Sequence, residues 1–180
     1  MKNVIHIFGA SGSGTTTLGK RIATEFGFQF MDTDDYYWLP TSPPYTQKRP
    51  GAQRVALMID KINHAENVVI SGSLTDWGDA LIPYFTLAIR VHTDTSLRLQ
   101  RLKLREQKAF GARIEQGGDM YCNHLEFLDW ASGYDTGDMS TRSKAKHDAW
   151  QELLCCERLD LDGTDLVHCD LSLIKQKIKI

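Results

Sequence analysis

Nine residues near the start of the chain have the amino-acid types of a loop that binds phosphate groups. They are Gly9-Ala10-Ser11-Gly12-Ser13-Gly14-Thr15-Thr16-Thr17. Glycines at these spacings allow successive backbone N–H groups to turn inward around a phosphate chain. An apolar run over residues 4–8 precedes the loop, and a helical pattern follows it, with Leu18, Ile22 and Phe26 four residues apart. A strand, a glycine loop and a helix in this order predict a phosphate-binding loop.

One position departs from the usual form of such a loop, in which lysine precedes a serine or threonine. Thr15 stands at the lysine position, and Thr16 follows where a hydroxyl group binds Mg²⁺. The start of the helix adds a partial positive charge. The stretch resembles the loops of some P-loop kinases, archaeal cytidylate kinases among them, which have a similar Gly-Thr-Thr. The competing interpretation is a glycine-rich turn that binds nothing. The expected nucleotide contacts are Gly9, Ser11, Gly12, Ser13, Gly14, Thr15, Thr16 and Thr17.

Three carboxylates follow the next apolar run. Residues 28–31 are expected to form the second strand, and Asp32, Asp34 and Asp35 come directly after it. Carboxylates at the C-terminal end of a strand in an α/β sheet lie where ligands bind. One could hold Mg²⁺ or its water, and another could accept the proton of an attacking hydroxyl group. The structural alternative is a cap for the next helix, because aspartate caps helices well.

The same segment resembles the Asp-x-Asp that follows the second strand of shikimate kinases, and gluconate kinases have something similar. The matching residues are Phe30-Met31-Asp32-Thr33-Asp34. In those families the first aspartate works with Mg²⁺ and the second contacts the substrate hydroxyl. The resemblance therefore implies that Asp32, together with Thr16, binds the metal, and that Asp34 is the catalytic residue at the acceptor.

An aromatic, proline-rich segment comes next. Tyr36-Tyr37-Trp38 leads into residues 40–50, where four prolines prevent a regular helix. We expect a loop on the substrate side, whose rings either contact a base or the acceptor or simply pack the loop down. Lys48 and Arg49 are the nearest loop cations that could replace the absent lysine, whereas Lys20 is rotated away from Thr15 on its helix.

Arginines recur along the helix expected over residues 93–105. Arg98, Arg101 and Arg105 fall on one stripe, and the last two repel each other unless an anion lies nearby. A solvated basic face is the alternative. The pair resembles the Arg-x-x-x-Arg that enters the lid of adenylate kinases. That resemblance implies that Arg101 lies on the adenine and that Arg105 contacts the phosphates.

A lid-like insertion is expected around residues 106–133, where the apolar pattern lapses and glycines recur. Closure of such a flap over ATP would exclude water. Arg113 within it could bring positive charge to the transferred phosphoryl group, and a plain surface loop is the competing interpretation. After the flap, a helix is expected to begin at Ser140 or Thr141, which puts Arg142 in its first turn. A cation is disfavoured there, which indicates an anionic partner, and kinases of this type often return an arginine to the phosphates at this point.

The composition of the whole chain is that of one ordinary globular domain, residues 1–180. Hydrophobic residues make up 42% and the net charge is −2, so no field favours nucleic acid or an anionic membrane. No signal peptide, membrane-spanning run or zinc pattern of cysteines is visible, and the expected location is cytoplasmic with reduced thiols. The expected partners are ATP and a small phosphate acceptor, with no nucleic acid, no membrane and no obligate protein partner.

Strand and helix patterns alternate along the chain, which predicts an α/β three-layer sandwich around a mainly parallel five-stranded sheet. The expected strands cover residues 4–8, 28–31, 68–70, 84–91 and 157–161. The chain resembles adenylate-kinase-like small kinases of the P-loop superfamily, which implies the strand order 2-3-1-4-5. The resemblance also implies a phosphotransferase with ATP and Mg²⁺ as cofactors, acting on a nucleoside monophosphate or a metabolite hydroxyl. The alternative is a non-catalytic nucleotide-binding module, because the loop lysine is missing.

Overall fold

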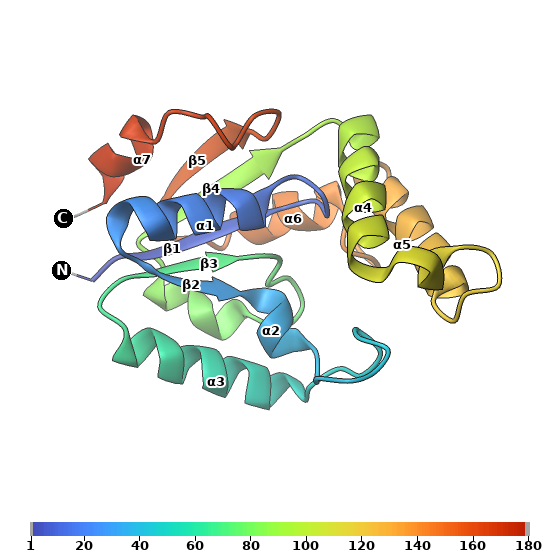
Figure 1. The fold of residues 1–180 in the computed structure, drawn as a ribbon. Helices are drawn as coiled ribbons and strands as arrows, with labels where there is room; N and C mark the ends of the chain where they lie inside the picture. The colour runs from blue at the N-terminus through green and yellow to red at the C-terminus, as the bar shows by residue number, and fades with distance from the viewer. Residues whose placement is uncertain (1, 179–180) are drawn as a thin grey trace.

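A computed structural model describes residues 2–178. Its centre is a sheet of five strands that all run parallel, in the order β2-β3-β1-β4-β5 (Figure 1). The strands are β1 (Val4–Gly9), β2 (Gln29–Asp32), β3 (Val68–Ser71), β4 (Leu87–His92) and β5 (Glu157–Asp162). The expected strand order is confirmed, and each predicted strand is present within a few residues of its expected bounds.

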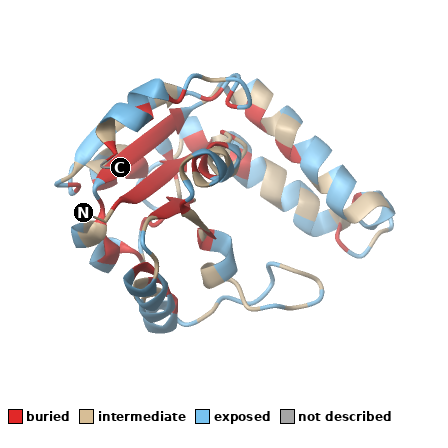
Figure 2. Ribbon diagram, turned by 60° about the vertical axis from the view of Figure 1, so that its left-hand side comes forward, coloured by how far each residue is buried: buried red, intermediate tan, exposed pale blue. Residues whose placement is uncertain are grey.

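Helices cover both faces of the sheet, as a parallel sheet requires. The helices are α1 (Thr15–Phe26), α2 (Thr33–Tyr37), α3 (Gly51–His64), α4 (Thr95–Phe110), α5 (Tyr121–Ser132), α6 (Lys144–Gln151) and α7 (Ser172–Lys177), and the 3₁₀ turns are η1 (Asp79–Tyr84), η2 (Gly111–Ile114) and η3 (Gly133–Asp135). Alternate residues of β1 supply two separate cores. Val4 and Phe8 pack with α3 and α6, whereas Ile5 and Ile7 pack with α1 and α7. The predicted three-layer sandwich is therefore confirmed, and Figure 2 shows the buried strands between exposed helix faces.

Three local predictions need correction. The helix expected over residues 93–105 begins at Thr95, capped by the Asp94 carboxylate, and continues to Phe110, past the lapse in the apolar pattern. Tyr36 and Tyr37, expected in the proline-rich loop, belong instead to the short helix α2, which Asp32 caps as the structural alternative predicted. Helix α6 begins at Lys144 behind the cap residue Ser143, so Arg142 lies before the helix and not in its first turn.

Helices α4 and α5 stand together beyond the C-terminal ends of the strands (Figure 1). They are joined through η2, and this is the region where a lid was expected. Their mostly exposed surfaces contrast with the buried sheet (Figure 2). Within residues 2–178, no helix has the length and apolar character needed to cross a membrane.

Candidate active site

The loop between β1 and α1 has the backbone shape that its glycines predict. Gly12 (φ 79°) and Gly14 (φ 103°) have left-handed conformations that favour glycine. A Cβ atom on Gly12 would lie 2.6 Å from the Arg98 carbonyl oxygen. Gly14 caps α1 without a side-chain acceptor, so the first N–H groups of the helix, from Thr15 onward, remain available. Buried Ser13 Oγ also has no hydrogen-bond partner among residues 2–178. The loop thus presents unused donors, as a phosphate site requires.

Oxygen ligands for a divalent cation meet beside this loop. Thr16 Oγ1 donates a hydrogen bond to Asp32 Oδ2 at 3.2 Å, and Ser71 Oγ lies 3.4 Å from Thr16 Oγ1. Hydroxyl and carboxylate oxygens are ligands that Mg²⁺ accepts. The described residues contain no group of three His, Cys, Asp or Glu side chains that could hold a metal alone. The donor set fits an ion that takes most of its ligands from water and phosphate.

Asp32 also caps the helix that follows it. Its Oδ1 accepts from the Asp34 backbone N–H at 3.1 Å. Burial raises the pKa of the Asp32 carboxyl, and the nearby charges of Asp34 and Asp35 raise it further, whereas the hydrogen bonds from Asp34 and Thr16 lower it. A bound cation would oppose this rise by favouring the ionised form. The capping and metal-binding interpretations of Asp32 are therefore compatible.

Asp34 lies exposed in the first turn of α2. Its charge acts on the guanidinium of Arg142 and on the phenol of Tyr45 in the proline-rich loop. The charge of Arg105 on α4 acts on the same phenol. Asp34 is therefore close enough to Arg142 for their charges to interact, and Asp34 and Arg105 both lie near Tyr45. We call the region around Asp34, Tyr45, Arg105 and Arg142, beside the glycine loop, the mouth of the site.

Arg142 reaches the glycine loop directly. Its Nη2 donates to Ser11 Oγ at 2.5 Å, and its guanidinium carbon lies 4.5 Å from the centroid of the Trp130 ring. Burial lowers the pKa of the Arg142 guanidinium, and the charge of Asp34 opposes that shift. Arg105 lies over another ring of α5, with its guanidinium carbon 5.9 Å from the centroid of Phe127.

The remaining two predicted arginines have different surroundings. Arg101 donates to the carbonyl oxygens of Gly163 (2.9 Å) and Thr164 (2.8 Å), which follow β5. These bonds hold Arg101 beside the glycine loop. Arg113 instead forms a two-point ion pair with Asp119, at 2.9 and 2.7 Å, on the exposed surface of the α4–α5 region. None of its contacts among the described residues reaches the glycine loop.

The aromatic segment is largely occupied with its own packing. Tyr37 has the guanidinium carbon of Arg54 3.8 Å from its centroid and lies edge-on to Trp38 and Trp77. Arg49 donates to backbone carbonyl oxygens of residues 36 and 38. These contacts favour the packing interpretation for Tyr37.

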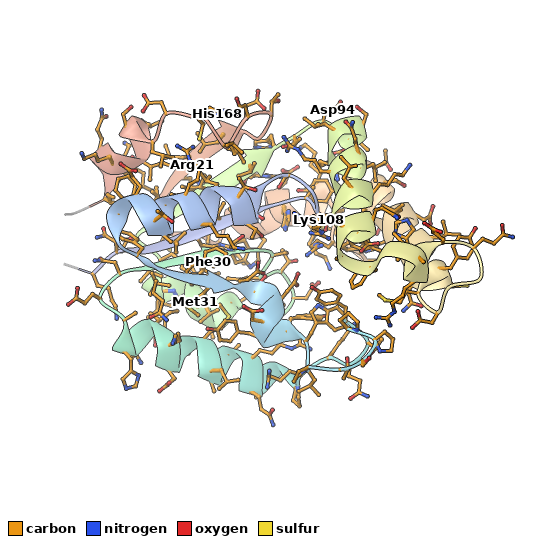
Figure 3. All side chains as sticks on the ribbon, viewed as in Figure 1. Arg21, Phe30, Met31, Asp94, Lys108 and His168 are labelled. Carbon is orange, nitrogen blue, oxygen red and sulfur yellow. The ribbon has the colours of Figure 1, made fainter. Side chains whose placement is uncertain are left out.

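Several residues at the mouth were missed in the sequence. Arg54 is buried beside the aromatic segment, and Phe127 and Trp130 provide rings to two arginines. Lys108 follows Arg105 by three residues and extends the same basic stripe; Figure 3 shows it near the end of α4, with Asp94 at the start. The spacing of Phe127 and Trp130, three residues apart, was the available signal for a shared helix face.

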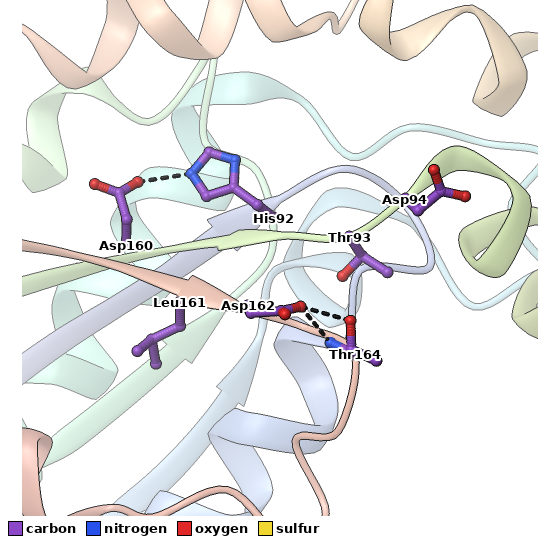
Figure 4. A pocket seen from close by; sticks show the side chains of 7 residues that line it. All are labelled: His92, Thr93, Asp94, Asp160, Leu161, Asp162 and Thr164. Atoms are coloured by element: carbon purple, nitrogen blue, oxygen red, sulfur yellow. Dashed lines mark hydrogen bonds and ion pairs between the residues drawn. The ribbon is translucent and has the colours of Figure 1, made fainter.

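A separate hollow lies between the ends of β4 and β5 (Figure 4). Three aspartates line it: Asp94, Asp160 and Asp162. His92 Nε2 and Asp160 Oδ1 are hydrogen-bonded there, 2.7 Å apart. Carboxylates repel polyphosphate, so this hollow is a poor phosphate site although Thr93 on its wall donates to the Ser13 carbonyl oxygen.

Comparison with known proteins identifies a family to which the chain belongs. No family model matches the chain. YqaC of Bacillus subtilis (strain 168), an uncharacterized protein, is 38% identical over 162 residues, which cover 90% of this chain and 89% of YqaC. The chain belongs to the same family as YqaC. A probable gluconokinase of Xenopus tropicalis is 40% identical over 47 residues, which cover 26% of this chain and 25% of that protein.

The solved structures place the fold of this family. A shikimate kinase from Bacteroides thetaiotaomicron superposes with a TM-score of 0.54 at 14% identity, over 97% of this chain and 93% of that one. The family therefore has the fold of the small P-loop kinases, as the sequence resemblance implied. At this identity the likeness establishes the fold and leaves the chemistry to the site itself.

Proposed function

We propose that this protein is an ATP-dependent phosphotransferase that moves the γ-phosphoryl group of ATP to a small acceptor, either a metabolite hydroxyl or a nucleoside monophosphate. The observation that carries the proposal is the 3.2 Å contact between the Thr16 hydroxyl and the Asp32 carboxylate at the mouth of the glycine loop. It joins a phosphate loop to an acidic strand end, with Asp34 two residues further on. Nucleotide, metal and acceptor can therefore meet at one point.

Different residues would bind the phosphates, the adenine, the metal and the acceptor. The N–H groups of residues 9–17 would hold the phosphates, and Arg101 would lie against the adenine. Thr16 and Asp32 would hold Mg²⁺, which when bound neutralises charge on the phosphate oxygens. Asp34 would orient the acceptor hydroxyl and accept its proton. The acceptor oxygen would then bond to the γ-phosphorus while the bond to the β-phosphate oxygen breaks and ADP leaves.

Positive charge at the mouth would stabilise the transferred group. Arg142 is suited to this because it contacts Ser11 of the glycine loop and its charge interacts with that of Asp34. Arg105 lies near Tyr45, as Asp34 does. Arg113 would join them only if residues 106–133 closed as a lid and its pair with Asp119 opened. A metabolite hydroxyl is one acceptor class, supported by the gluconokinase match and the shikimate kinase fold. A nucleoside monophosphate is the other.

Thr15 supports one alternative, a non-catalytic nucleotide-binding module. On that hypothesis ATP binds the glycine loop and changes the α4–α5 region, and no phosphate is transferred. It predicts ATP binding without ADP formation against every acceptor.

The test is ADP release from Mg²⁺·ATP against nucleoside monophosphates, nucleosides, and sugar and hydroxy acids. We expect one acceptor class to produce ADP. Asp34→Asn should keep ATP binding and lose transfer by about 10²-fold or more, because it removes a positioned base. ATP binding without ADP from any acceptor would support the alternative, and a full rate in Asp34→Asn would refute the role of Asp34.

A further inference from the structure

The glycine loop contains no cation of its own. Residues 9–17 include no lysine or arginine, and threonine occupies the position where lysine normally contacts the phosphates. Backbone N–H groups and the helix dipole contribute only partial charges. Tight and reactive binding of a triphosphate therefore calls for a full positive charge from another segment.

Most nearby cations are already engaged. Arg98 is paired with Asp135 at 2.8 Å, and Arg101 donates to two carbonyl oxygens behind the loop. Arg49 donates to the carbonyl oxygens of the aromatic segment. Lys20 lies 5.7 Å from the ring centroid of Phe30, on α1. In the described part of the chain, none of these side chains donates to a side chain of the glycine loop.

Arg142 combines three features that none of these cations shares in full. It donates to a side chain of the glycine loop itself, through Nη2 and Ser11 Oγ at 2.5 Å. Its buried Nε has no hydrogen-bond partner in the described part of the chain. No carboxylate among residues 2–178 forms an ion pair with it, although the charge of Asp34 is near enough to act on it. Guanidinium has five N–H donors, so Arg142 retains capacity for phosphate oxygens.

An aromatic ring holds this guanidinium in place. The centroid of Trp130 lies 4.5 Å from its central carbon, and Trp130 is stacked with Phe127 at 6.0 Å between centroids. A ring face attracts a cation without neutralising it, whereas a carboxylate would cancel the charge. Helix α5 therefore supplies a support that leaves the charge of Arg142 intact.

We propose that Arg142 supplies the positive charge that lysine provides in other phosphate-binding loops, and that Trp130 is its positioning residue. The inference rests on the proposed function for its effect on transfer, but its effect on phosphate binding does not require transfer. The proposal gives helix α5 a role in the site, because the ring of Trp130 fixes the position of the Arg142 guanidinium.

The first experiment measures binding of inorganic tripolyphosphate by calorimetry. Arg142→Ala should weaken binding about tenfold or more, because a hydrogen bond to a charged group is lost. Arg158→Ala, which removes an exposed arginine paired with Glu152, should bind as the wild type does. Thr15→Lys in the Arg142→Ala background should restore binding, whereas Thr15→Lys alone should give little gain. Equal binding by Arg142→Ala and wild type would overturn the proposal.

The second experiment measures transfer with the acceptor identified above. Arg142→Ala should lower kcat about 10²- to 10³-fold, as for other charges aimed at a reacting group. Added guanidinium ion should recover part of that rate by filling the space beside Trp130. Trp130→Phe should retain most of the rate, and Trp130→Leu should lose most of it while its thermal unfolding stays normal. A normal kcat in a folded Trp130→Leu would refute the positioning role.

The two proposals fail separately. If wild type binds tripolyphosphate through Arg142 but makes no ADP with any acceptor, the phosphotransferase is refuted and the charge substitution stands. If wild type transfers phosphate and Arg142→Ala does so equally well, the substitution is refuted and the phosphotransferase stands.

Discussion

Arg98 and Arg142 both approach the same glycine loop, but the surroundings of their guanidinium groups are opposite in kind. Arg98 is fully buried, and its donors are used by Thr93 O (3.1 Å), Ala131 O (3.3 Å) and Thr95 Oγ1 (2.7 Å), with Asp135 as its ion partner at 2.8 Å. Among residues 2–178, Arg142 has one hydrogen bond, an Nε without a partner and an aromatic ring beneath its guanidinium. An arginine with all donors satisfied joins structural elements, and one with spare donors can bind a ligand.

Removal of Arg98 should have the largest effect, and on stability. Arg98→Ala breaks the pair with Asp135 and leaves several polar groups without a donor, so the free energy of unfolding should fall by about 3 kcal/mol. Asp135 is 46% exposed and can be rehydrated, which limits the loss. Thermal unfolding checks this, since about 3 kcal/mol in a chain of this size lowers Tm by roughly 6–12 °C. An unchanged Tm would contradict the structural role.

Removal of Arg142 should give the reverse pattern. Arg142→Ala loses one hydrogen bond and one ring contact, so the free energy of unfolding should change by about 1 kcal/mol or less. The transfer rate should nevertheless fall about 10²- to 10³-fold. Measuring Tm and kcat on both arginine variants tests the comparison. If both variants lost stability and rate in parallel, the distinction between a structural Arg98 and a ligand-binding Arg142 would be refuted.

Buried histidines extend the comparison to pH. His147 donates to or accepts from Tyr134 and Ser73, and burial, aided by the charges of Arg142 and Arg90, lowers its pKa to about 3. Burial lowers the pKa of His6 to about 4. Below the unfolded pKa near 6.5 the unfolded chain binds more protons, so each histidine should cost about 1.4 kcal/mol per pH unit as pH falls toward 4.

Denaturant unfolding between pH 7 and pH 4 measures this loss. His147→Gln should show a shallower fall in stability than the wild type, because one proton-binding group is gone from the unfolded chain. Equal slopes in the two proteins would show that His147 does not contribute.

The smallest effect is expected at Arg113. Its pair with Asp119 is fully on the surface, where ion pairs contribute little. Arg113→Ala should leave Tm close to the wild-type value and reduce kcat far less than Arg142→Ala does. A loss of rate as large as that of Arg142→Ala would indicate that residues 106–133 close over the site and bring Arg113 into it.

The sequence was sufficient for features that depend on local pattern. The glycine loop, the five strands and the acidic strand end follow from spacing and residue type, and β2 ends at Asp32, one residue beyond its expected end. The end of α4 was not predictable from the apolar pattern, because residues 106–110 of that helix contribute little to the core and continue it largely exposed. The sequence gives no reason to treat the three arginines of this stripe differently. The packing makes Arg98 buried, Arg101 half-buried and Arg105 exposed.

The order of the helices and strands, and the phosphate-binding character of the glycine loop, are predictable from the sequence, since both follow from neighbouring residues. Tertiary structure alone decided which cation stands at the missing lysine. Arg142 is 131 residues from Ser11 along the chain and touches it because β1, α5 and α6 meet at one end of the sheet. The ring of Trp130 and the absence of an ion-paired carboxylate among the described residues then leave its charge unneutralised. Such long-range contacts carry no periodic signal in the sequence, because they depend on how separate elements pack.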